Sequence, residues 1–367
     1  MSQTVPVGVR TDMLTLPAYV PGRRVEAVPD LVPYKLSSNE NPYPPLPSVR
    51  GAVTAAVHDI NRYPDPACTA LTQDLATHLG VGERQLSLGT GSVGVLQQAM
   101  LCCVEPKGEV VFAWRSFEAY PILTTVVGGT PVRVPLTPDG RHDLDAMAAA
   151  VNTSTRMILL CSPNNPTGPA LRRAEVERFL SEVPAHVPVV LDEAYVEFIR
   201  DEDAVDGLAL LPQHPNLVVL RTFSKAYGLA GLRVGYAVAD ERVAAVLRSA
   251  AVPFGVSGLG QVAARASLAT PARAELFDRV SALVAERDRV ATALADQGWA
   301  VPPAQGNFVW LPLGERSGEF TQAAAEQALA VRGFGGDGVR VSIGEAEANS
   351  RFLQLAAAFA PPGLAAG

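Results

Sequence analysis

Side chains that can do chemistry follow directly after several apolar stretches in the middle of the chain. Asn165 follows the stretch that begins at residue 156, Asp192 and Tyr195 follow the one at 187, and Ser224 and Lys225 follow the one at 216. A lysine amine can form a Schiff base with a carbonyl carbon and can then move a proton as a general acid or base. A carboxylate can keep a nearby ring nitrogen protonated, while amide and hydroxyl groups can hydrogen-bond an oxygen. These residue types together favour Schiff-base chemistry.

The elements that must position these side chains alternate between short apolar runs and helical segments from about residue 85 to 240. The runs are LSL at 86, EVVFAW at 109, TPVRVPL at 130, RMILLC at 156, VPVVLD at 187, NLVVLRTF at 216 and RVGYAV at 233. The alternation predicts an α/β fold, with a mostly parallel seven-stranded sheet sandwiched by helices. Ligands bind outside the carboxyl ends of the strands in such a sheet, which is where the polar side chains fall.

A glycine-rich turn, GTGSVG at 89–94, lies between the first of these runs and a helical stretch. Its glycines match the pattern of a dinucleotide-binding turn, but such a site needs an acidic residue about 20 positions on to bind the ribose hydroxyls. Arg115, Ser116 and Phe117 follow EVVFAW, so that carboxylate is missing. Backbone N–H groups and a helix N-terminus can still hold a phosphate. We therefore expect a phosphate site that does not bind NAD.

Each residue also has an ordinary structural interpretation. Asp192 could cap a helix, Asn165 could belong to a β-turn, Lys225 could be a solvated surface lysine and Phe117 a core aromatic. The joint set nevertheless supplies the groups that pyridoxal 5'-phosphate (PLP) demands: a lysine, a carboxylate for the pyridine nitrogen, partners for the ring oxygen, an aromatic face, and a phosphate site made of the glycine turn, Ser224 and Arg233. The sequence therefore predicts PLP as a cofactor.

Motifs spread over almost the whole chain point in the same direction. They are LPAYVPG at 16, KLSSNENPYPP at 35, NRYPDP at 61, GTGSVG at 89, SPNNPTG at 162, LDEAYVEF at 191, RTFSKAYGLAGLRVGY at 221, QGNFVW at 305 and GDGVRVSIGE at 336. With these motifs the chain resembles the fold-type I PLP-dependent aminotransferases, in the branch of histidinol-phosphate and aromatic amino acid aminotransferases. The segment around Lys225 is highly specific, whereas the glycine turn alone is not.

The resemblance implies a role for each matching residue. Lys225 matches the Schiff-base lysine, Asp192 the pyridine-nitrogen aspartate, Asn165 and Tyr195 the ring-oxygen partners, and Phe117 the ring-stacking position, where relatives often have tyrosine. The expected phosphate ligands are Thr90, Gly91, Ser92, Ser224 and Arg233. Arg340 matches the arginine that binds the substrate α-carboxylate, a task suited to a planar guanidinium fork. Lys225, Asp192 and Tyr195 are the expected catalytic residues.

The resemblance also implies an obligate homodimer with composite sites. Tyr63 matches a tyrosine that reaches the cofactor site of the neighbouring subunit in this family. Tyr19 and Arg332 match positions that contact the distal end of the substrate. Amino acids and 2-oxo acids are the expected small-molecule partners.

Two departures from the family pattern are visible. Relatives often carry acidic residues where this chain has Val93 and Gly94, and a proline where it has Gly333. The first departure is expected to leave phosphate binding intact, because backbone N–H groups do that work. The second bears on how Arg332 is placed.

Two substrates fit this branch of the family. We expect ping-pong transfer of an amino group between an aromatic amino acid and 2-oxoglutarate, because the stretches WRSFEAYP at 114 and AVPFGVSGLG at 251 look more like the aromatic aminotransferases. An aromatic side chain needs a flat apolar slot. Histidinol phosphate is the alternative, since Arg332, Tyr19 and Tyr63 could bind its phosphate. A related PLP decarboxylase is less expected, because Arg340 would bind the carboxylate that a decarboxylase expels.

Composition sets the remaining expectations. The chain has 367 residues, 48% hydrophobic and 18% charged, with a net charge of −7 and no cluster of Lys and Arg, so neither nucleic acid nor a membrane is an expected partner. The histidines and cysteines lack metal-ligand spacing, and a reduced, cytoplasmic location fits the cysteines. We expect an N-terminal arm with part of the small domain at 1–45, a large PLP-binding domain at 46–248 and a small α+β domain at 249–367.

Overall fold

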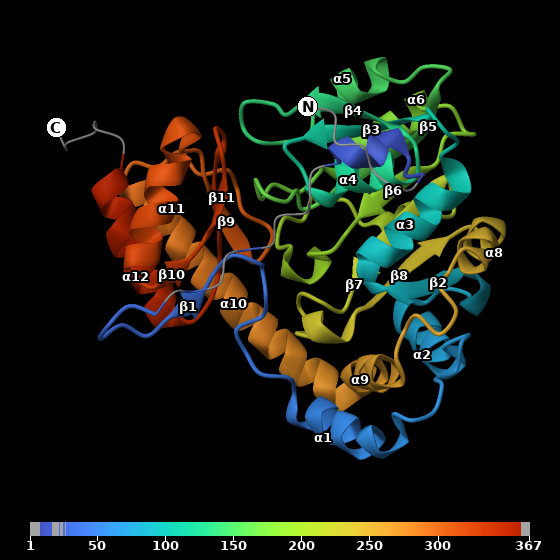
Figure 1. Ribbon diagram of the computed structural model, residues 1–367, viewed down its shortest axis with the longest axis horizontal. Helices are drawn as coiled ribbons and strands as arrows, with labels where there is room; N and C mark the ends of the chain where they lie inside the picture. Colours follow the sequence, from blue (N-terminus) through green and yellow to red (C-terminus); the bar gives the residue numbers. More distant parts are fainter. Residues whose placement is uncertain (1–7, 17–21, 23–24, 26, 361–367) are drawn as a thin grey trace.

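A seven-stranded sheet forms the centre of the larger of two lobes (Figure 1). The structure is a computed structural model that describes residues 8–16, 22, 25 and 27–360. The strands are β2 (Leu86–Thr90), β3 (Glu109–Trp114), β4 (Thr130–Pro135), β5 (Thr155–Cys161), β6 (Val189–Asp192), β7 (Leu217–Thr222) and β8 (Val234–Ala239), in the order β2-β8-β7-β6-β5-β3-β4. Strand β8 runs antiparallel to both of its neighbours, β2 and β7, and the other strand pairs of this sheet are parallel. The predicted α/β fold with a mostly parallel seven-stranded sheet is confirmed.

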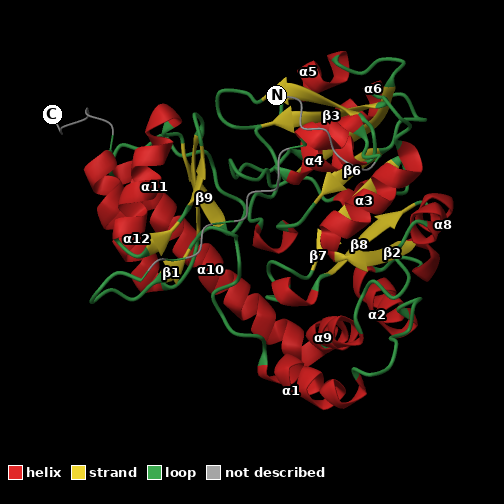
Figure 2. Ribbon diagram, viewed as in Figure 1, coloured by secondary structure: helices red, strands yellow, loops and turns green. Residues whose placement is uncertain are grey.

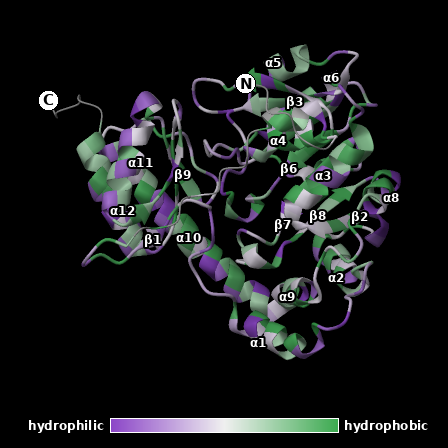
Figure 3. Ribbon diagram, in the orientation of Figure 1, coloured by the Kyte–Doolittle hydropathy of each residue, from purple (hydrophilic) through white to green (hydrophobic). Residues whose placement is uncertain are grey.

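Helices cover both faces of this sheet, because its inner strands carry apolar residues on both sides. On one face lie α3 (Gly91–Cys103), α4 (Ala119–Val126) and α8 (Glu241–Ser249). On the other lie α2 (Thr69–Leu79), α5 (Leu144–Ala149), α6 (Arg173–Glu182) and α7 (Gly207–Leu210). Figure 3 shows the strands of this sheet mostly in the apolar colour, whereas polar and apolar residues alternate along the solvent-facing helices.

The smaller lobe is built on a three-stranded antiparallel sheet of β9 (Phe308–Leu311), β11 (Arg332–Phe334) and β12 (Gly338–Ser342), with β12 in the middle. Helices α11 (Ser317–Glu326) and α12 (Ala346–Phe359) cover it (Figure 2). An early segment of the chain joins this lobe, since β1 (Tyr34–Lys35) pairs with β10 (Leu329–Ala330). Helix α9 (Gly258–Leu268) packs on α2 and on α1 (Pro47–Ala56), and α10 (Thr270–Asp296) leads from there to the smaller lobe.

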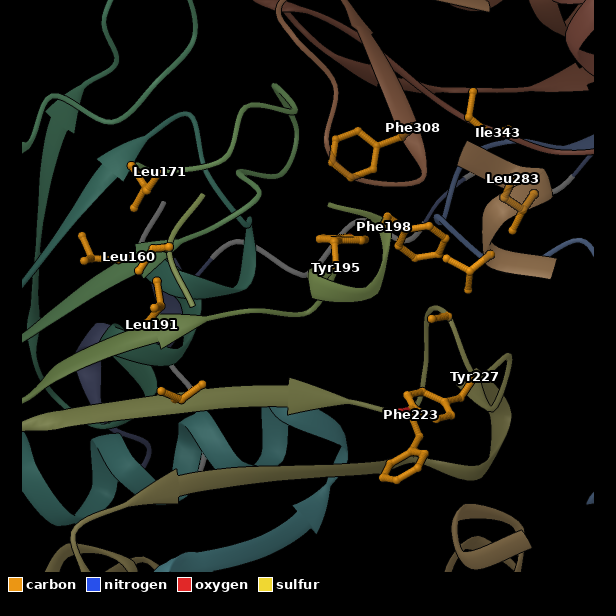
Figure 4. Packing of buried hydrophobic residues seen from close by; sticks show 14 of the residues in the cluster. Leu160, Leu171, Leu191, Tyr195, Phe198, Phe223, Tyr227, Leu283, Phe308 and Ile343 are labelled. Atoms are coloured by element: carbon orange, nitrogen blue, oxygen red, sulfur yellow. The ribbon is translucent and has the colours of Figure 1, made fainter. Parts of the chain in front are cut away.

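A continuous core joins the two lobes next to the carboxyl end of β6. Tyr195 and Phe198 follow β6, and both are buried with Leu283 and Phe308 of the C-terminal part of the chain (Figure 4). The rings of Tyr195 and Phe308 meet edge to face, with centroids 5.1 Å apart. This packing fixes the segment after β6 relative to the smaller lobe.

The described part of the chain contains neither a membrane-spanning helix nor a cluster of potential metal ligands. None of its helices is long and apolar enough to cross a membrane. No group of three or more His, Cys, Asp or Glu side chains within the described ranges is arranged to hold a metal ion.

Candidate active site

A cavity of about 470 Å³ lies where the carboxyl ends of β5, β6 and β7 meet the smaller lobe. Most residues predicted from the sequence line it: Ser92, Phe117, Asn165, Asp192, Tyr195, Ser224, Lys225, Arg233, Arg332 and Arg340. Thr90 and Gly91 directly precede Ser92 at the start of α3. The fold therefore brings together residues from positions that are far apart in the sequence.

Asp192 ends β6 and is buried in the floor of this cavity. Its Oδ2 accepts a hydrogen bond from the Tyr120 hydroxyl at 2.9 Å, whereas its buried Oδ1 has no hydrogen-bond partner among the described residues. Burial raises the pKa of Asp192 to about 6, against the lowering effect of the Tyr120 hydrogen bond. A buried carboxylate oxygen without a donor fits a ligand that brings an N–H to it.

Lys225 lies in the loop after β7, and its Nζ donates to the carbonyl oxygen of Ser38 at 3.0 Å. Burial, and then the positive charges of Arg340 and Arg233, lower the pKa of this amine to about 7. A large fraction of the amine is therefore unprotonated at neutral pH. The structure thus contradicts the interpretation of Lys225 as a solvated surface lysine and gives it the nucleophilic form that attack on a carbonyl requires.

A cup for an anion forms at the N-terminus of α3. Nη1 of Arg233 donates to the Ser224 hydroxyl at 3.3 Å, and Nη2 donates to the carbonyl oxygen of Thr90 at 3.4 Å. Gly91 has φ +77°, and a Cβ atom there would collide with the Arg233 guanidinium. Glycine is therefore required at 91 both for the backbone conformation and for the approach of the arginine. Helix N–H groups, a hydroxyl and a guanidinium form a site suited to a phosphate monoester.

The departure at Gly94 has a local explanation. A Cβ atom at this position would collide with Oγ1 of Thr90. The glycine therefore leaves room for the Thr90 side chain beside the cup.

Asn165, Tyr195 and Arg340 also line the cavity. Arg340 donates to Oδ1 of Asn165 at 2.5 Å and to the carbonyl oxygen of Ser37 at 2.6 Å, which leaves the NH₂ group of Asn165 to donate to a ligand. The Tyr195 hydroxyl accepts from Nδ2 of Asn39 at 2.9 Å. Burial raises the pKa of Tyr195, so its hydroxyl keeps a proton that it can donate.

The distal wall combines an ion pair with apolar side chains. Arg332 of β11 lies directly opposite Arg340 of β12 in the strand register. Its guanidinium is ion-paired with Glu118, the residue that precedes α4. Among the described residues, Phe117, Ala119, Ile122, Leu123 and Phe334 add apolar side chains to the lining of the cavity. The site can therefore enclose a largely apolar group beyond Arg340.

The departure at Gly333 concerns the strand that carries Arg332. A Cβ atom at 333 would lie 2.6 Å from Oγ1 of Thr321 in α11. Glycine thus allows α11 to pack closely on β11, and Arg332 stays in the cavity wall.

Tyr63, one of the predicted residues, does not line the cavity of its own chain. Tyr63 is 83% exposed, and its ring lies 4.6 Å from the ring of Phe254. Phe254 lines a separate surface depression that also includes Thr90 and the exposed side chains of Leu101 and Val252. Tyr19 lies outside the described residues.

Among the residues that sequence reasoning missed, Tyr120, Glu118 and Asn39 have side chains that contact the predicted set. Tyr120 and Glu118 lie next to Phe117 in the stretch SFEAY, whose polar positions gave no spacing signal. Asn39 belongs to the motif SSNENP, and it is held by hydrogen bonds of 2.8 Å that join it to the Ser342 hydroxyl. Its φ is 52°, a conformation in which Asn is favoured over most residues.

An α/β sheet whose strand ends gather a lysine of lowered pKa, a carboxylate with an unsatisfied oxygen and a phosphate cup defines a PLP-dependent enzyme acting on amino groups. The chain belongs to the family described as aminotransferase class I and II, whose family model matches residues 33–354. It is therefore an aminotransferase. PLP is the cofactor of this family. Its chemistry fits the residues present, which are Oδ1 of Asp192, unpaired among the described residues, the amine of Lys225 and the phosphate cup at the start of α3.

Similar proteins span the full chain. A protein of Streptomyces avermitilis named aromatic amino acid aminotransferase is 56% identical, covering 98% of this chain and 99% of that relative. A Thermobifida fusca protein with the same name is 52% identical over 97% of this chain and 98% of the relative. Among solved structures, the histidinol-phosphate aminotransferase of Sinorhizobium meliloti in complex with PLP is 29% identical, with a TM-score of 0.82 over 98% of this chain and 96% of that one.

Proposed function

We propose that this aminotransferase exchanges an amino group between an aromatic amino acid and 2-oxoglutarate by a ping-pong mechanism. The observation that carries the proposal is the distal wall, in which the described residues combine apolar side chains with an arginine already paired with Glu118. Such a wall suits a flat apolar side chain better than a phosphate. The names of the Streptomyces and Thermobifida relatives support the same substrate class.

The residues around the cofactor site divide the work by their chemistry. PLP, when bound, supplies an electron sink for the electron pair released at the substrate α-carbon. Lys225 would hold the cofactor covalently through Nζ and, once released, move a proton to and from that carbon, for which a pKa of about 7 is well matched. Oδ1 of Asp192 would accept the pyridine N–H and keep that nitrogen protonated.

The other residues would bind and orient. Tyr195 and Asn165 would donate to the ring oxygen, and the Phe117 ring would cover one face of the pyridine. The phosphate would be held by Thr90, Gly91, Ser92, Ser224 and Arg233. Arg340 would bind the substrate α-carboxylate through its fork of donors.

We also propose a homodimer in which Tyr63 completes the cofactor site of the neighbouring subunit. Tyr63 is exposed in its own chain, and it borders a surface with the exposed apolar residues Ile60, Leu101, Val252 and Phe254. Exposed apolar side chains that gather in this way are typical of a subunit interface. The depression beside Tyr63 includes Thr90, so this surface borders the phosphate cup.

We propose the division into an arm at 1–45, a large PLP-binding domain at 46–248 and a small domain at 249–367. All strands of the seven-stranded sheet fall within 46–248, and β9, β11 and β12 fall within 249–367, which supports it. Hydrogen exchange that protects these ranges as separate cooperative units would test the boundaries.

We propose that the enzyme works in the cytoplasm. Cys68, Cys102, Cys103 and Cys161 are all free thiols, as expected in a reducing compartment. Cell fractionation followed by detection of the protein tests this proposal, and recovery outside the cytoplasmic fraction would contradict it.

The decisive experiment compares amino donors at equal concentrations. The purified protein is loaded with PLP, and turnover of phenylalanine, tyrosine and histidinol phosphate is measured with 2-oxoglutarate as acceptor. We expect the aromatic amino acids to have the higher kcat/KM. A strong preference for histidinol phosphate would replace the proposal by the second candidate, which the Sinorhizobium meliloti structure favours.

A further inference from the structure

We propose that Glu118 determines substrate selectivity by neutralising Arg332, so that the distal wall favours an uncharged aromatic side chain over an anionic one. The inference rests on the proposed function and adds a residue to it. A substrate with a distal carboxylate or phosphate would have to displace the Glu118 carboxylate from Arg332 before it could bind there.

The two arginines of the cavity have different partners. They lie opposite each other in β11 and β12. Arg340 donates to an amide oxygen of Asn165 and to a carbonyl oxygen of Ser37, and both of these acceptors are neutral. Arg332 is ion-paired with an acid. The positive charge at the distal end of the cavity is thus compensated by a carboxylate.

Glu118 is placed for this role rather than for holding its helix. It is the N-cap residue of α4, but its side chain makes no capping hydrogen bond and reaches Arg332 instead. The Arg332 side chain is 9% exposed and that of Glu118 is 28% exposed, so the pair is shielded more than a surface salt bridge. Shielding strengthens the attraction between the two charges and also their effect on a third charge nearby.

The same helix carries the apolar part of the wall. Ala119, Ile122 and Leu123 follow Glu118 in α4 and line the cavity, with Phe334 of β11 on the other side. An aromatic ring would contact these side chains without disturbing the ion pair. A phosphate or carboxylate at the same depth would face the Glu118 carboxylate, and this contact between like charges would weaken its binding relative to that of an uncharged ring.

The test uses Glu118→Gln, which keeps the size of the side chain and removes its charge. Binding of 3-phenylpropionate and of glutarate to the PLP-loaded enzyme is measured by titration calorimetry. We expect the affinity for glutarate to rise roughly tenfold, an effect between those typical of exposed and of buried ion pairs. The affinity for 3-phenylpropionate should change less than about twofold. Glu118→Asp, which keeps the charge, should retain most of the wild-type preference.

Asp337→Asn is the matched control. It breaks the neighbouring ion pair between Arg115 and Asp337, in the same contact between the two lobes, and neither residue lines the cavity. The ratio of the two affinities should stay at the wild-type value. An unchanged ratio in Glu118→Gln, or an equal shift in both variants, would overturn the inference.

Turnover separates this inference from the proposed function. Phenylalanine, glutamate and histidinol phosphate are each mixed with wild-type and Glu118→Gln enzyme in single half-reactions. A wild-type enzyme that fails to convert phenylalanine would contradict the proposed function. If wild type converts phenylalanine well, and wild type and Glu118→Gln prefer phenylalanine over glutamate to the same degree, only the role of Glu118 would be contradicted.

Discussion

The hydroxyl of Tyr195 accepts a hydrogen bond from the side chain of Asn39, at 2.9 Å. The phenol oxygen is thus oriented by a residue that lies more than 150 positions earlier in the chain, and its own proton is left for the ligand. Both side chains are buried, at 3% exposure for Tyr195 and 1% for Asn39, so no solvent competes for these bonds.

We predict that Asn39→Gly weakens donation from Tyr195 to the ring oxygen of bound PLP and raises the pKa of the lysine-linked cofactor. Glycine is chosen because φ at 39 is 52°, which a Cβ-bearing residue adopts at a cost. The visible absorbance is recorded against pH, and the midpoint should move upward. Tyr195→Phe should shift it further in the same direction, and an unchanged midpoint in both would refute the assigned geometry.

Lys225→Ala should abolish covalent attachment of PLP and lower kcat by roughly 10²- to 10⁴-fold, the range typical for loss of a general acid–base group. Absorbance of the dialysed protein reports attachment, and addition of phenylalanine should no longer shift the band. A variant that still binds PLP covalently after dialysis would show that another amine is used. Lys35→Ala, outside the cavity and paired with Glu40, is the control.

We predict that Asp192 makes the stability of the PLP-free protein depend on pH. The pKa of Asp192 is about 6 in the folded protein, above the value near 3.9 in an unfolded chain. The contribution of its protonated carboxyl to the free energy of unfolding is therefore fully present below about pH 4 and is lost as pH rises through 6. Asp192→Asn removes this loss, and we expect the PLP-free variant to unfold at a higher temperature than wild type at pH 7.5, by a few degrees. The difference should vanish at pH 4, and a difference that does not depend on pH would contradict the cause.

The same substitution has the opposite effect once the cofactor binds. A neutral amide at 192 cannot keep the pyridine nitrogen protonated, so kcat of Asp192→Asn with phenylalanine should fall by roughly 10²-fold or more. Stopped-flow half-reactions at pH 7.5 measure this loss separately from stability.

Mixing chains tests the shared site. One chain carries Tyr63→Phe and the other Lys225→Ala, and neither homodimer has a complete site. Random pairing yields heterodimers in which one site is intact, so about a quarter of all sites should be wild type. Activity of the mixture above the average of the two separate variants is the expected result, and the absence of any gain after subunit exchange would argue against the proposed contribution of Tyr63.

Much of the fold was predictable because its strands are buried on both faces. Such strands read as short continuous apolar runs, and the seven runs identified between 86 and 238 all became strands of one sheet. Lys225 and Asp192 could be placed because residues after parallel strands gather at one edge. The polar residues that directly follow the strands therefore indicated where the site lies.

The contacts that tune the site were not predictable from local pattern. Glu118 and Arg332 are 214 positions apart, and Tyr120 meets Asp192 over a separation of 72. Each looks like an ordinary polar residue in its own stretch, because a long-range pair leaves no periodic signal. The reason for a glycine at 333 also lies outside its own stretch, because the side chain of Thr321 in α11 occupies the space beside it.

The pairing of β1 with β10 has a consequence for how the enzyme is made. Residues 36–39, which continue from β1, supply the carbonyl oxygens that Arg340 and Lys225 contact and the amide that holds Tyr195. Their own anchors are Ala330 and Ser342, which the ribosome adds some 300 residues later. A nascent chain thus carries Lys225 long before the catalytic wall exists, and we expect stable loading with cofactor to wait until synthesis has passed β12.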